Sequence, residues 1–350
     1  MNDTPVPEPR RATLDDVARE AGVSLATADR ALNGRPGVRP ATRAKIQAAV
    51  ARLAYRANPA ATLLARNRSF RFVFILPANS NSFMANLEAH VRQAADSTGP
   101  QTAFIDVRHV DVFDPAALAA ALETLPTHYD GVALVAADHP RVRAAIDDLA
   151  ARGTHVVTLV SDAPTSRRFH YVGIDNPAAG RTAGSLMGRF LGGTRFGKIG
   201  VIAGSLTLRD HAERQFGFNQ VMSTEYARFT VLPALEGRDD PIRNQALVAG
   251  LLATHPDLVG IYNIGAGNEG IATALVVSAR ARDVIWIAHE LSAETRRLLC
   301  CDVVDAVIDQ IAGHEARSAA RVLLARCTDA PINPDQERIR IDIFLRDNLP

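Results

Sequence analysis

Cysteine, lysine and long apolar segments are scarce in this chain of 350 residues. Its three cysteines, Cys300, Cys301 and Cys327, are too few for a disulfide framework and lack the spacing of metal ligands, which argues against both kinds of site. No apolar run reaches the roughly 18 residues of a membrane-spanning helix, so no membrane partner is expected. Residues 1–11 are polar and rich in proline, without the apolar segment of a secretory signal. We therefore expect a protein of the reducing cytoplasm.

The composition excludes bulk disorder. Hydrophobic residues make up 47% of the chain and charged residues 22%, as in ordinary globular proteins. A chain of this length can bury large cores and is expected to form two or three domains.

The two signs of charge are unevenly distributed along the chain. Only Lys45 and Lys198 are lysines, so nearly all basic residues are arginines. Residues 1–69 carry 12 basic and 6 acidic side chains, a net charge of +6, whereas the remainder carries 27 basic and 32 acidic side chains, a net charge of −5. A small basic head on an acidic body suggests that the head contacts a polyanion such as nucleic acid, although chance clustering would give the same imbalance.

The sequence pattern of residues 12–58 predicts three short helices in a helix-turn-helix arrangement. Residues 1–11 before them are expected to form a disordered tail. Thr13 can cap the first helix, with Asp16 three residues further on, and Gly22 ends it. Ser24 can cap a second helix that runs to about residue 32, and Pro40 suits the first position of a third. The tight glycine-containing link between the first two helices is typical of this motif. The predicted core of the head is Val17, Val23, Ala31, Leu32, Ile46 and Leu53.

From Phe70 to the end, short apolar runs alternate with alanine- and leucine-rich helical patterns. Alternation of this kind indicates parallel sheets covered by helices, and the number of units exceeds one sheet. The predicted fold class is α/β, with two Rossmann-like subdomains over residues 70–350. The expected strands lie at 72–76, 103–107, 132–136, 155–160, 198–203, 228–232, 258–262 and 284–288, and the expected helices at 85–95, 115–125, 141–151, 178–191, 212–224, 243–253 and 269–279.

Residues 11–58 carry five motifs at fixed spacing: T-x-x-D-V-A from Thr13, A-G-V-S from Ala21, T-x-x-R-x-L-N from Thr27, V-x-x-x-T-R from Val38 and L-x-Y from Leu53. Together they closely resemble the DNA-binding head of the lac repressor (LacI/GalR) family. Residues 70–345 resemble the same family more loosely. This resemblance implies a periplasmic-binding-protein-like body that holds a small effector and forms dimers.

The resemblance implies which residues of the head contact DNA. A recognition helix places its N-terminal residues at base edges in the major groove, so Leu25, Ala26, Thr27 and Arg30 are candidate base readers. Leu25 and Ala26 can offer only apolar contact with thymine methyl groups, whereas Arg30 can donate hydrogen bonds to bases. The candidates for the phosphate backbone are Thr13, Ser24, Asn33, Thr42 and Asn58, of which Thr13 and Ser24 can equally act as helix caps.

Asp29 departs from the family, which usually has serine at that position. Its carboxylate would repel phosphates facing it. It could instead orient Arg30 or Arg35, or accept a hydrogen bond from cytosine. We expect a different operator preference.

Residues 59–69 match the family's hinge helix. The segment AATLLAR at 60–66 is too short to form a stable helix alone, so it is expected to order only on DNA. Leu64 falls where the family has a leucine that enters the minor groove and kinks the operator. The alternative is an exposed linker leucine.

Polar residues that follow the predicted strands of the body are candidates for an effector cleft, because the carboxyl ends of parallel strands face a crevice. By resemblance, Arg214 matches the family's effector arginine, Glu290 stands where an aspartate is common, and Gln310 matches a frequent polar contact. A carboxylate and an arginine suit the hydroxyl groups of a sugar or polyol, although each residue could also be an ordinary surface group. The candidates are Asn79, Asn81, Phe83, Ser161, Asp162, Arg214, Asn263, Asn268, Glu290 and Gln310.

The segment from Gly265 to Gly270 matches the G-x-G-x-x-G fingerprint of dinucleotide sites. Taken alone, it suggests an NAD-dependent oxidoreductase with an accessory basic head, but a glycine-lined effector loop explains it as well. A solute-binding transport component is a further alternative, against which the missing signal and the basic head argue.

The sequence thus predicts a ligand-responsive transcriptional regulator with a head at 12–58, a hinge at 59–69 and an effector-binding and dimerisation body at 70–350. It is expected to bind a palindromic operator in double-stranded DNA as a homodimer, because one head reads one half-site. The resemblance favours repression over activation. No catalytic residue, cofactor or metal is expected.

Overall fold

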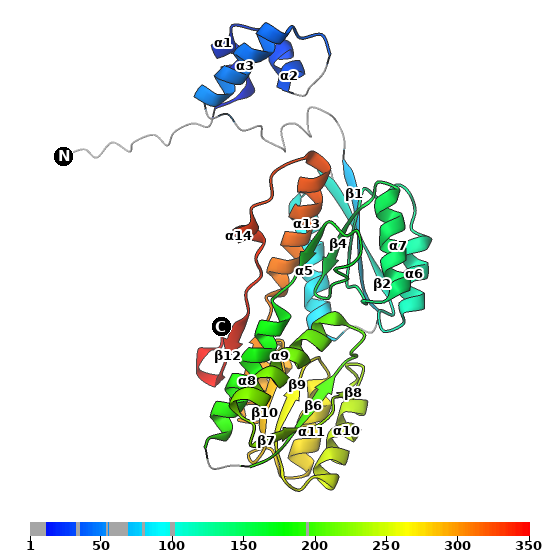
Figure 1. Ribbon diagram of the computed structural model, residues 1–350, viewed down its shortest axis with the longest axis vertical. Helices are drawn as coiled ribbons and strands as arrows, with labels where there is room; N and C mark the ends of the chain where they lie inside the picture. The colour runs from blue at the N-terminus through cyan, green and yellow to red at the C-terminus, as the bar shows by residue number, and fades with distance from the viewer. Residues whose placement is uncertain are drawn as a thin grey trace, which may run out of the picture. The chain divides into compact units, whose positions relative to one another are not determined.

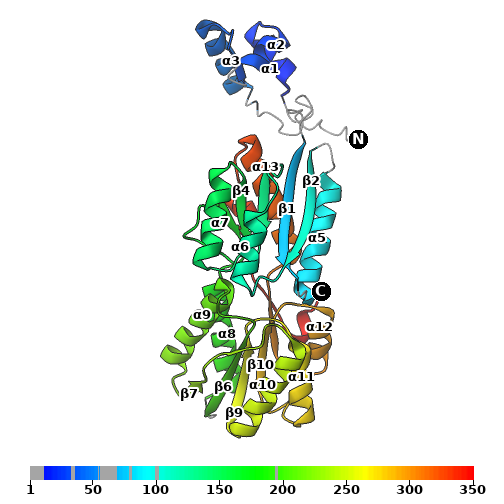
Figure 2. The same ribbon diagram turned by 90° about the vertical axis from the view of Figure 1, so that its right-hand side faces the viewer.

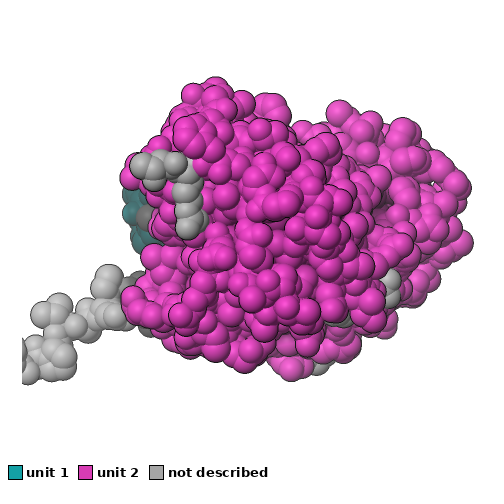
Figure 3. Space-filling view, turned by 90° about the horizontal axis from the view of Figure 1, so that it is seen from below, with its two compact units in different colours: residues 1–68 teal, residues 69–350 magenta. Residues whose placement is uncertain are grey.

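The structure is a computed structural model that describes residues 12–32, 36–53, 55, 69–78, 81–98, 102–193 and 196–350. The chain divides into two compact units, residues 1–68 and 69–350, which Figure 3 colours separately. The first unit holds the predicted head and the second holds the predicted body.

The head contains the three predicted helices, α1 (Leu14–Ala21), α2 (Leu25–Leu32) and α3 (Pro40–Arg52). Thr13 caps α1, because its hydroxyl accepts a hydrogen bond from the Asp16 N–H and the Asp16 carboxylate accepts one from the Thr13 N–H at 2.8 Å. Gly22 ends α1 in the left-handed conformation that favours glycine, with φ of 63°.

The core of the head is small and nearly as predicted. Val17, Ala31, Ile46 and Ala49 are buried together, with Val23 and Leu53 packed at their edge. Leu32 was expected in this core but is 39% exposed. The buried face of α2 is formed by Ala28 and Ala31, and the next residue along a helix points about 100° away from that face.

The body has two lobes, and the N-terminal lobe is built around a five-stranded sheet. Its three inner strands are buried over most of their length, as in parallel sheets covered on both faces, whereas most residues of its two edge strands are exposed or half-buried. The elements are β1 (Phe70–Pro77), α5 (Ser82–Thr98), β2 (Ala103–Val110), α6 (Pro115–Glu123), β3 (Gly131–Leu134), α7 (Pro140–Ala151), β4 (His155–Leu159), β5 (His170–Val172) and, from far along the chain, α13 (Ala312–Thr328).

The C-terminal lobe is built around a second sheet. Its elements are α8 (Asn176–Leu191), β6 (Gly197–Ala203), α9 (Arg209–Glu225), β7 (Phe229–Val231), β8 (Leu235–Glu236), α10 (Pro241–Thr254), β9 (Leu258–Asn263), α11 (Asn268–Val277), β10 (Ile285–His289), α12 (Ala293–Cys300), β11 (Ala306–Asp309), β12 (Asp342–Phe344) and the short 3-10 helix Arg346–Asn348; α14 (Pro334–Glu337) precedes β12.

Helices cover both faces of each sheet (Figures 1 and 2). The strand order is β2-β1-β3-β4-β5 in the first lobe and β12-β11-β10-β9-β6-β7 in the second, with β8 beside β6. Neighbours are parallel except β11 and β12. In the first sheet α5 and α13 pack together, as do α6 and α7; in the second, α8 pairs with α9 and α10 with α11. The predicted α/β class with two subdomains is confirmed.

The chain crosses between the lobes three times. The first crossing joins β5 to α8, the second joins β11 to α13, and the third runs from α13 through α14 to β12. The second crossing contains Ile311, whose φ of 33° is unusual for a β-branched residue. These crossings bring the carboxyl ends of both sheets to one interface within the body.

The helices α8 and α9 approach each other through glycines. A Cβ atom added at Gly180 would lie 2.0 Å from the backbone oxygen of Arg214, and one added at Gly217 would lie 2.1 Å from that of Pro177. Real Cβ atoms do not approach a backbone oxygen so closely, so the backbones would have to separate. The close packing holds α9, and therefore Arg214, against α8.

Gly180→Ala is expected to destabilise the body by about 1–3 kcal/mol, because the added methyl group forces α8 and α9 apart. Urea unfolding of the full chain measures this change. Gly250→Ala in α10 is the matched control, since its Cβ would meet nothing within 4 Å. That control should be neutral or stabilise by up to about 1 kcal/mol through helix propensity. Equal effects of the two substitutions would contradict the close approach.

Candidate functional site

The head presents one exposed face of α2. Leu25 is 50% exposed at the first position of α2, and Ala26 and Arg30 are exposed four residues apart, the spacing that places two residues on one side of a helix. The Ser24 hydroxyl accepts a hydrogen bond from the Thr27 N–H at 3.2 Å and lies 2.8 Å from the Thr27 hydroxyl. Ser24 therefore caps α2 and fixes the start of the helix that carries the candidate base readers.

The other candidates of the head lie around this helix or outside the described residues. Thr13 is exposed at the start of α1, and Thr42 is half-buried in the first turn of α3. Asp29 is half-buried on α2. Burial of the Tyr55 hydroxyl raises its pKa, and the nearby charge of Asp29 raises that pKa further. Asn33, Asn58 and Leu64 lie outside the described residues.

The body contains a cavity between its two lobes, near the carboxyl ends of β1, β4, β6, β9, β10 and β11. The cavity volume in this closed arrangement is about 40 Å³, and the wider space among the lining atoms, about 500 Å³, includes open solvent. Five predicted effector residues line it: Asn81, Phe83, Arg214, Glu290 and Gln310. The other lining residues are Pro77, Met84, Val112, Phe113, Val135, Val160, Leu208, Asp210, His211, Asp239, Gly265 and Ala266.

Arg214 is the buried centre of this cavity. Its Nε donates a hydrogen bond to Asn176 Oδ1 at 2.9 Å, its Nη1 donates to the Ile264 carbonyl at 3.0 Å, and Nη1 lies 3.7 Å from Glu290 Oε1. Burial opposes its charge, but the carboxylates of Asp210 and Glu290 raise the pKa of Arg214. Its Nη2 atom is buried and has no partner among the described residues, so it can donate to a bound molecule.

Glu290 and Gln310 form a buried pair beside Arg214. Gln310 Nε2 donates to Glu290 Oε1 at 2.6 Å. Burial raises the pKa of Glu290 to about 8, against the opposing effect of Arg214. Glu290 is thus mostly protonated at neutral pH. Within the described residues, Glu290 Oε2 and Gln310 Oε1 are buried without a partner.

Sequence reasoning missed three ionisable residues of the lining. Asp210 and His211 lie one turn before Arg214 on α9, and the Asp210 Oδ2–His211 Nε2 distance is 3.6 Å. The Ser205 N–H donates to His211 Nδ1, which therefore carries no proton. Asp239 follows β8 and accepts hydrogen bonds from the Ala266 N–H at 2.9 Å and from Asn81 Nδ2 at 3.1 Å.

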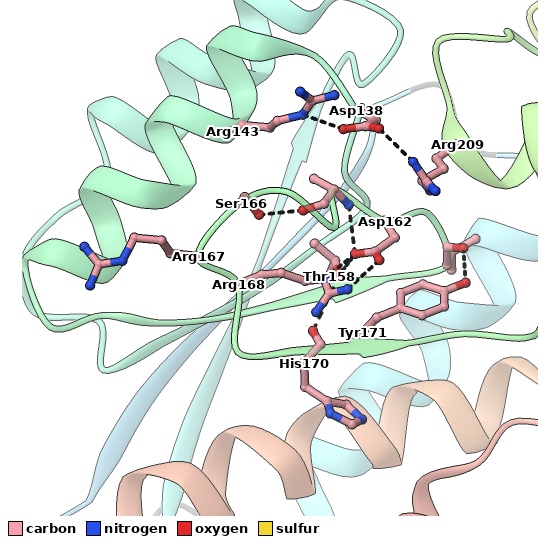
Figure 4. Close-up of polar contacts among 12 residues, drawn as sticks. Asp138, Arg143, Thr158, Asp162, Ser166, Arg167, Arg168, His170, Tyr171 and Arg209 are labelled. Atoms are coloured by element: carbon pink, nitrogen blue, oxygen red, sulfur yellow. Dashed lines mark hydrogen bonds and ion pairs between the residues drawn. The ribbon is translucent and has the colours of Figure 1, made fainter.

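Four predicted effector residues are not among those lining the cavity. Asp162 binds Arg168 at 2.5 and 2.7 Å within its own lobe (Figure 4). The Ser161 hydroxyl accepts a hydrogen bond from the Arg209 N–H at 3.1 Å. Asn263 and Asn268 are buried and hydrogen-bonded to each other at 2.7 Å, so both serve the loop after β9. Asn79 lies outside the described residues.

The two lobes contact each other around the cavity. Arg209 Nη1 of the C-terminal lobe donates to Asp138 Oδ2 of the N-terminal lobe at 3.2 Å, and Asp138 Oδ1 accepts from Arg143 at 2.7 Å (Figure 4). Arg238 and Asp111 form a second pair across the lobes at 3.3 Å. These contacts hold the lobes in a closed arrangement.

Three lining residues have a left-handed backbone conformation. The φ angles of Val160, Asp239 and Glu290 are 64°, 58° and 70°. Such conformations cost about 1–3 kcal/mol in residues other than glycine and concentrate at functional sites. The cavity is therefore a place where the fold sustains local strain.

The glycines from Gly265 to Gly270 are explained by packing within the protein. A Cβ at Gly265 would lie 2.4 Å from Asp239 Oδ1, one at Gly267 would lie 2.5 Å from Asn244 Nδ2, and one at Gly270 would lie 1.8 Å from the Pro241 oxygen. The Asp239 carboxylate already binds the Ala266 N–H just before α11, where a pyrophosphate would bind in a dinucleotide site. The oxidoreductase alternative has no support here.

Among the described residues, no group of three or more His, Cys, Asp or Glu side chains could hold a metal ion. None of the helices described is both long and apolar enough to cross a membrane.

Comparison with protein families gives two matches. The family of the periplasmic binding protein domain matches residues 72–330, and the family "Bacterial regulatory proteins, lacI family" matches residues 13–58. The two matches correspond to the body and the head.

Curated relatives match about a quarter of the chain. A catabolite control protein A of Priestia megaterium is 43% identical over 83 residues, which cover 24% of this chain and 25% of that protein. The HTH-type transcriptional regulator GntR of Pseudomonas aeruginosa is 44% identical over 80 residues, 23% of each chain. The match thus spans about a quarter of the length of these relatives.

Solved structures match the body. A solute-binding protein of Burkholderia graminis in complex with D-arabinose has a TM-score of 0.72 and 22% identity, covering 81% of this chain and 97% of that one. A glucose-galactose binding protein of Geobacillus stearothermophilus has a TM-score of 0.71 and 21% identity, covering 81% and 99%. At this identity the likeness establishes the fold.

Proposed function

Because the chain belongs to the periplasmic binding protein domain family and carries the helix-turn-helix head of the lacI family of bacterial regulatory proteins, we propose that it is a ligand-responsive, DNA-binding transcriptional regulator. One observation carries the proposal. A single chain joins an exposed helix face, Leu25, Ala26 and Arg30, to a body with a buried polar cavity between two lobes.

The head is proposed to read a palindromic operator in double-stranded DNA, with α2 in the major groove. Operator symmetry requires two heads, so the regulator acts as a homodimer. Val276 and Val277 at the end of α11 are exposed apolar residues suited to contact with a second body. Sedimentation velocity tests the dimer, and a monomer at operator-binding concentrations would contradict it.

The cavity is proposed to bind a sugar or polyol-like effector. Its lining comes from both lobes, so a bound molecule stabilises the closed arrangement relative to an open one. A ligand that favours one arrangement shifts the population and so changes the affinity for DNA. Repression is the proposed sign of regulation, by analogy with the family.

A selection experiment tests the proposed function. The full chain is used to enrich sequences from a random pool of DNA duplexes, and the enriched duplex is titrated with and without sugars and polyols. We expect a palindromic consensus whose affinity changes when an effector is present. Enrichment of no sequence would contradict the proposal.

Arg30→Ala should weaken the free energy of binding to the selected operator by about 1–3 kcal/mol, because a base contact is lost. The free energy of binding to scrambled DNA should weaken much less. Arg19→Ala on α1 is the matched control. It removes the same charge, but Arg19 lies on α1 and is paired with Asp15 at 2.6 Å. Fluorescence anisotropy at one salt concentration measures the affinities of the native chain and of both variants for both duplexes. Equal losses for both variants on both duplexes would show that Arg30 reads no base.

A further inference from the structure

The lining of the cavity is divided between the lobes by polarity. The N-terminal lobe contributes Phe83, Met84, Val112, Phe113, Val135 and other apolar groups. Within the described part of that lobe, Asn81 is the only polar side chain lining the cavity, and both ends of its amide are engaged. Its Nδ2 donates to Asp239 and its Oδ1 accepts from the Met84 N–H at 2.9 Å. One side of a bound molecule therefore faces an apolar wall.

The opposite wall offers both hydrogen-bond acceptors and donors. Asp210 Oδ1 and Gln310 Oε1 are acceptors buried without a partner among the described residues, and Arg214 Nη2 is a donor of the same kind. Glu290 Oε2 also lacks a partner there, and it donates while Glu290 is protonated. The four side chains are at most 7% exposed. Buried polar atoms require partners, so a bound molecule must both donate and accept hydrogen bonds. Hydroxyl groups do both, whereas ionised phosphate and carboxylate groups only accept.

The charges of the lining act in the same direction. Asp210, Asp239 and Glu290 supply three carboxyl groups, against the single guanidinium of Arg214. Burial raises the pKa of the fully buried Glu315 well above its ordinary range, which favours the uncharged form of this carboxyl group. With Glu290 protonated, two lining carboxylates still oppose one guanidinium. An added anion would thus enter a buried site that already has an excess of negative charge.

Helix N-termini, the usual alternative anion sites, are also occupied. The Arg209 N–H at the start of α9 donates to Ser161, and Asp210 lies in the first turn of that helix. The Ala266 N–H before α11 donates to Asp239. Neither terminus leaves these amides for a phosphate.

From this arrangement we infer that the cavity takes an unphosphorylated, non-acidic molecule with hydroxyl or amine donors on one side and an apolar group, such as a deoxy carbon or a glycoside substituent, on the other. This inference rests on the proposed function and narrows its ligand class. Free sugar phosphates and sugar acids are excluded as effectors.

The test compares matched derivatives of glucose, galactose and arabinose on the full chain by isothermal titration calorimetry. Each series contains the free sugar, its methyl and phenyl glycosides, the 2-amino sugar where one exists, the terminal phosphate and the aldonic acid. For a scaffold that binds, the phosphate and the acid should bind at least about tenfold more weakly than the free sugar, and a glycoside should bind as tightly or more tightly. Arg214→Ala should abolish every signal.

A second measurement tests how the charge of Glu290 affects the discrimination against phosphate. As the pH rises from 6.5 to 9, Glu290 ionises, so the discrimination against the phosphate should increase. Glu290→Gln should remove most of that increase.

The outcomes separate the two proposals. If a sugar phosphate or acid binds tightly and changes the affinity for DNA, while the free sugar does not bind, this inference is wrong. The proposed function as a ligand-responsive regulator is then still supported. No binding by any member of any series would contradict the inference and the proposed effector together. Selective binding of the neutral or aminated members supports both.

Discussion

Replacing Arg214 by alanine is expected to lower the free energy of unfolding of the body by about 3–5 kcal/mol, because it leaves buried carboxyl groups without their cation. Asp210 and Glu290 would both lose that partner, and the Asn176 amide and the Ile264 carbonyl would lose a donor. Urea unfolding measures the loss. The response to an effector should disappear, while operator binding by the separate head should persist.

Arg209→Ala on the same helix is the control for this loss. Arg209 is 38% exposed and bonds Asp138 and Glu213 near the surface, where ion pairs contribute about 0–1 kcal/mol. It should therefore cost far less stability than Arg214→Ala. A similar cost for both would show that Arg214 is not the centre of the buried network.

The cost of Arg214→Ala should also depend on pH. In the native chain the pKa of Glu290 is raised to about 8. The contribution of Glu290 to the free energy of unfolding therefore falls as the pH rises from the ordinary pKa of a glutamate towards 8, and it levels off above that pH. Without Arg214 the pKa of Glu290 should lie higher, and the fall should continue to higher pH. The difference in unfolding free energy between the native chain and Arg214→Ala should thus be larger at pH 9 than at pH 6. A constant difference would contradict the coupling.

Raising the salt concentration from 50 to 200 mM is expected to weaken operator binding by about a thousandfold. Each phosphate neutralised by a basic side chain adds about −0.9 to the slope of log affinity against log salt. Residues 1–69 have a net charge of +6, and a dimer presents this charge twice, so about six or more phosphate contacts are expected.

Fluorescence anisotropy across a salt series measures this slope. Scrambled duplex is the comparison, because non-specific binding depends on the same phosphate contacts. A slope shallower than about −3 on the operator would contradict the engagement of two heads on one site.

The sequence predicted most long elements and missed several short ones, with exceptions both ways: the 17-residue α13 was not among the expected helices, and the three-residue β7 lies within the strand expected at 228–232. The apolar run 258–262 and the helix expected at 178–191 agree closely with β9 and α8, because each has the residue periodicity of its structure over its whole length. The strands β5, β8 and β12 have only two or three residues and were not predicted. A strand of that length is defined by its neighbour in the sheet, which no local pattern contains.

The lining of the cavity was also predicted in part. Arg214 was identified by resemblance, and Asp210 and His211 could have been added, because residues three and four apart share one face of a helix. Asp239 gave no such signal, since it follows a two-residue strand and reaches the site through a left-handed turn. Asp162 had the right position after a strand, but Arg168, six residues further on, folds back to bind it.

The closed contact between the lobes has a consequence for the duration of a response. Arg214, Glu290 and Gln310 are at most 7% exposed, so a molecule bound to them is largely enclosed while the lobes touch. Separation of the contacts of Arg209 with Asp138 and of Arg238 with Asp111 widens its way out. Dissociation is therefore expected to be faster after a domain motion, which takes microseconds to milliseconds. In a regulator built in this way, release of the effector is therefore expected to lag briefly behind a fall in the surrounding effector concentration.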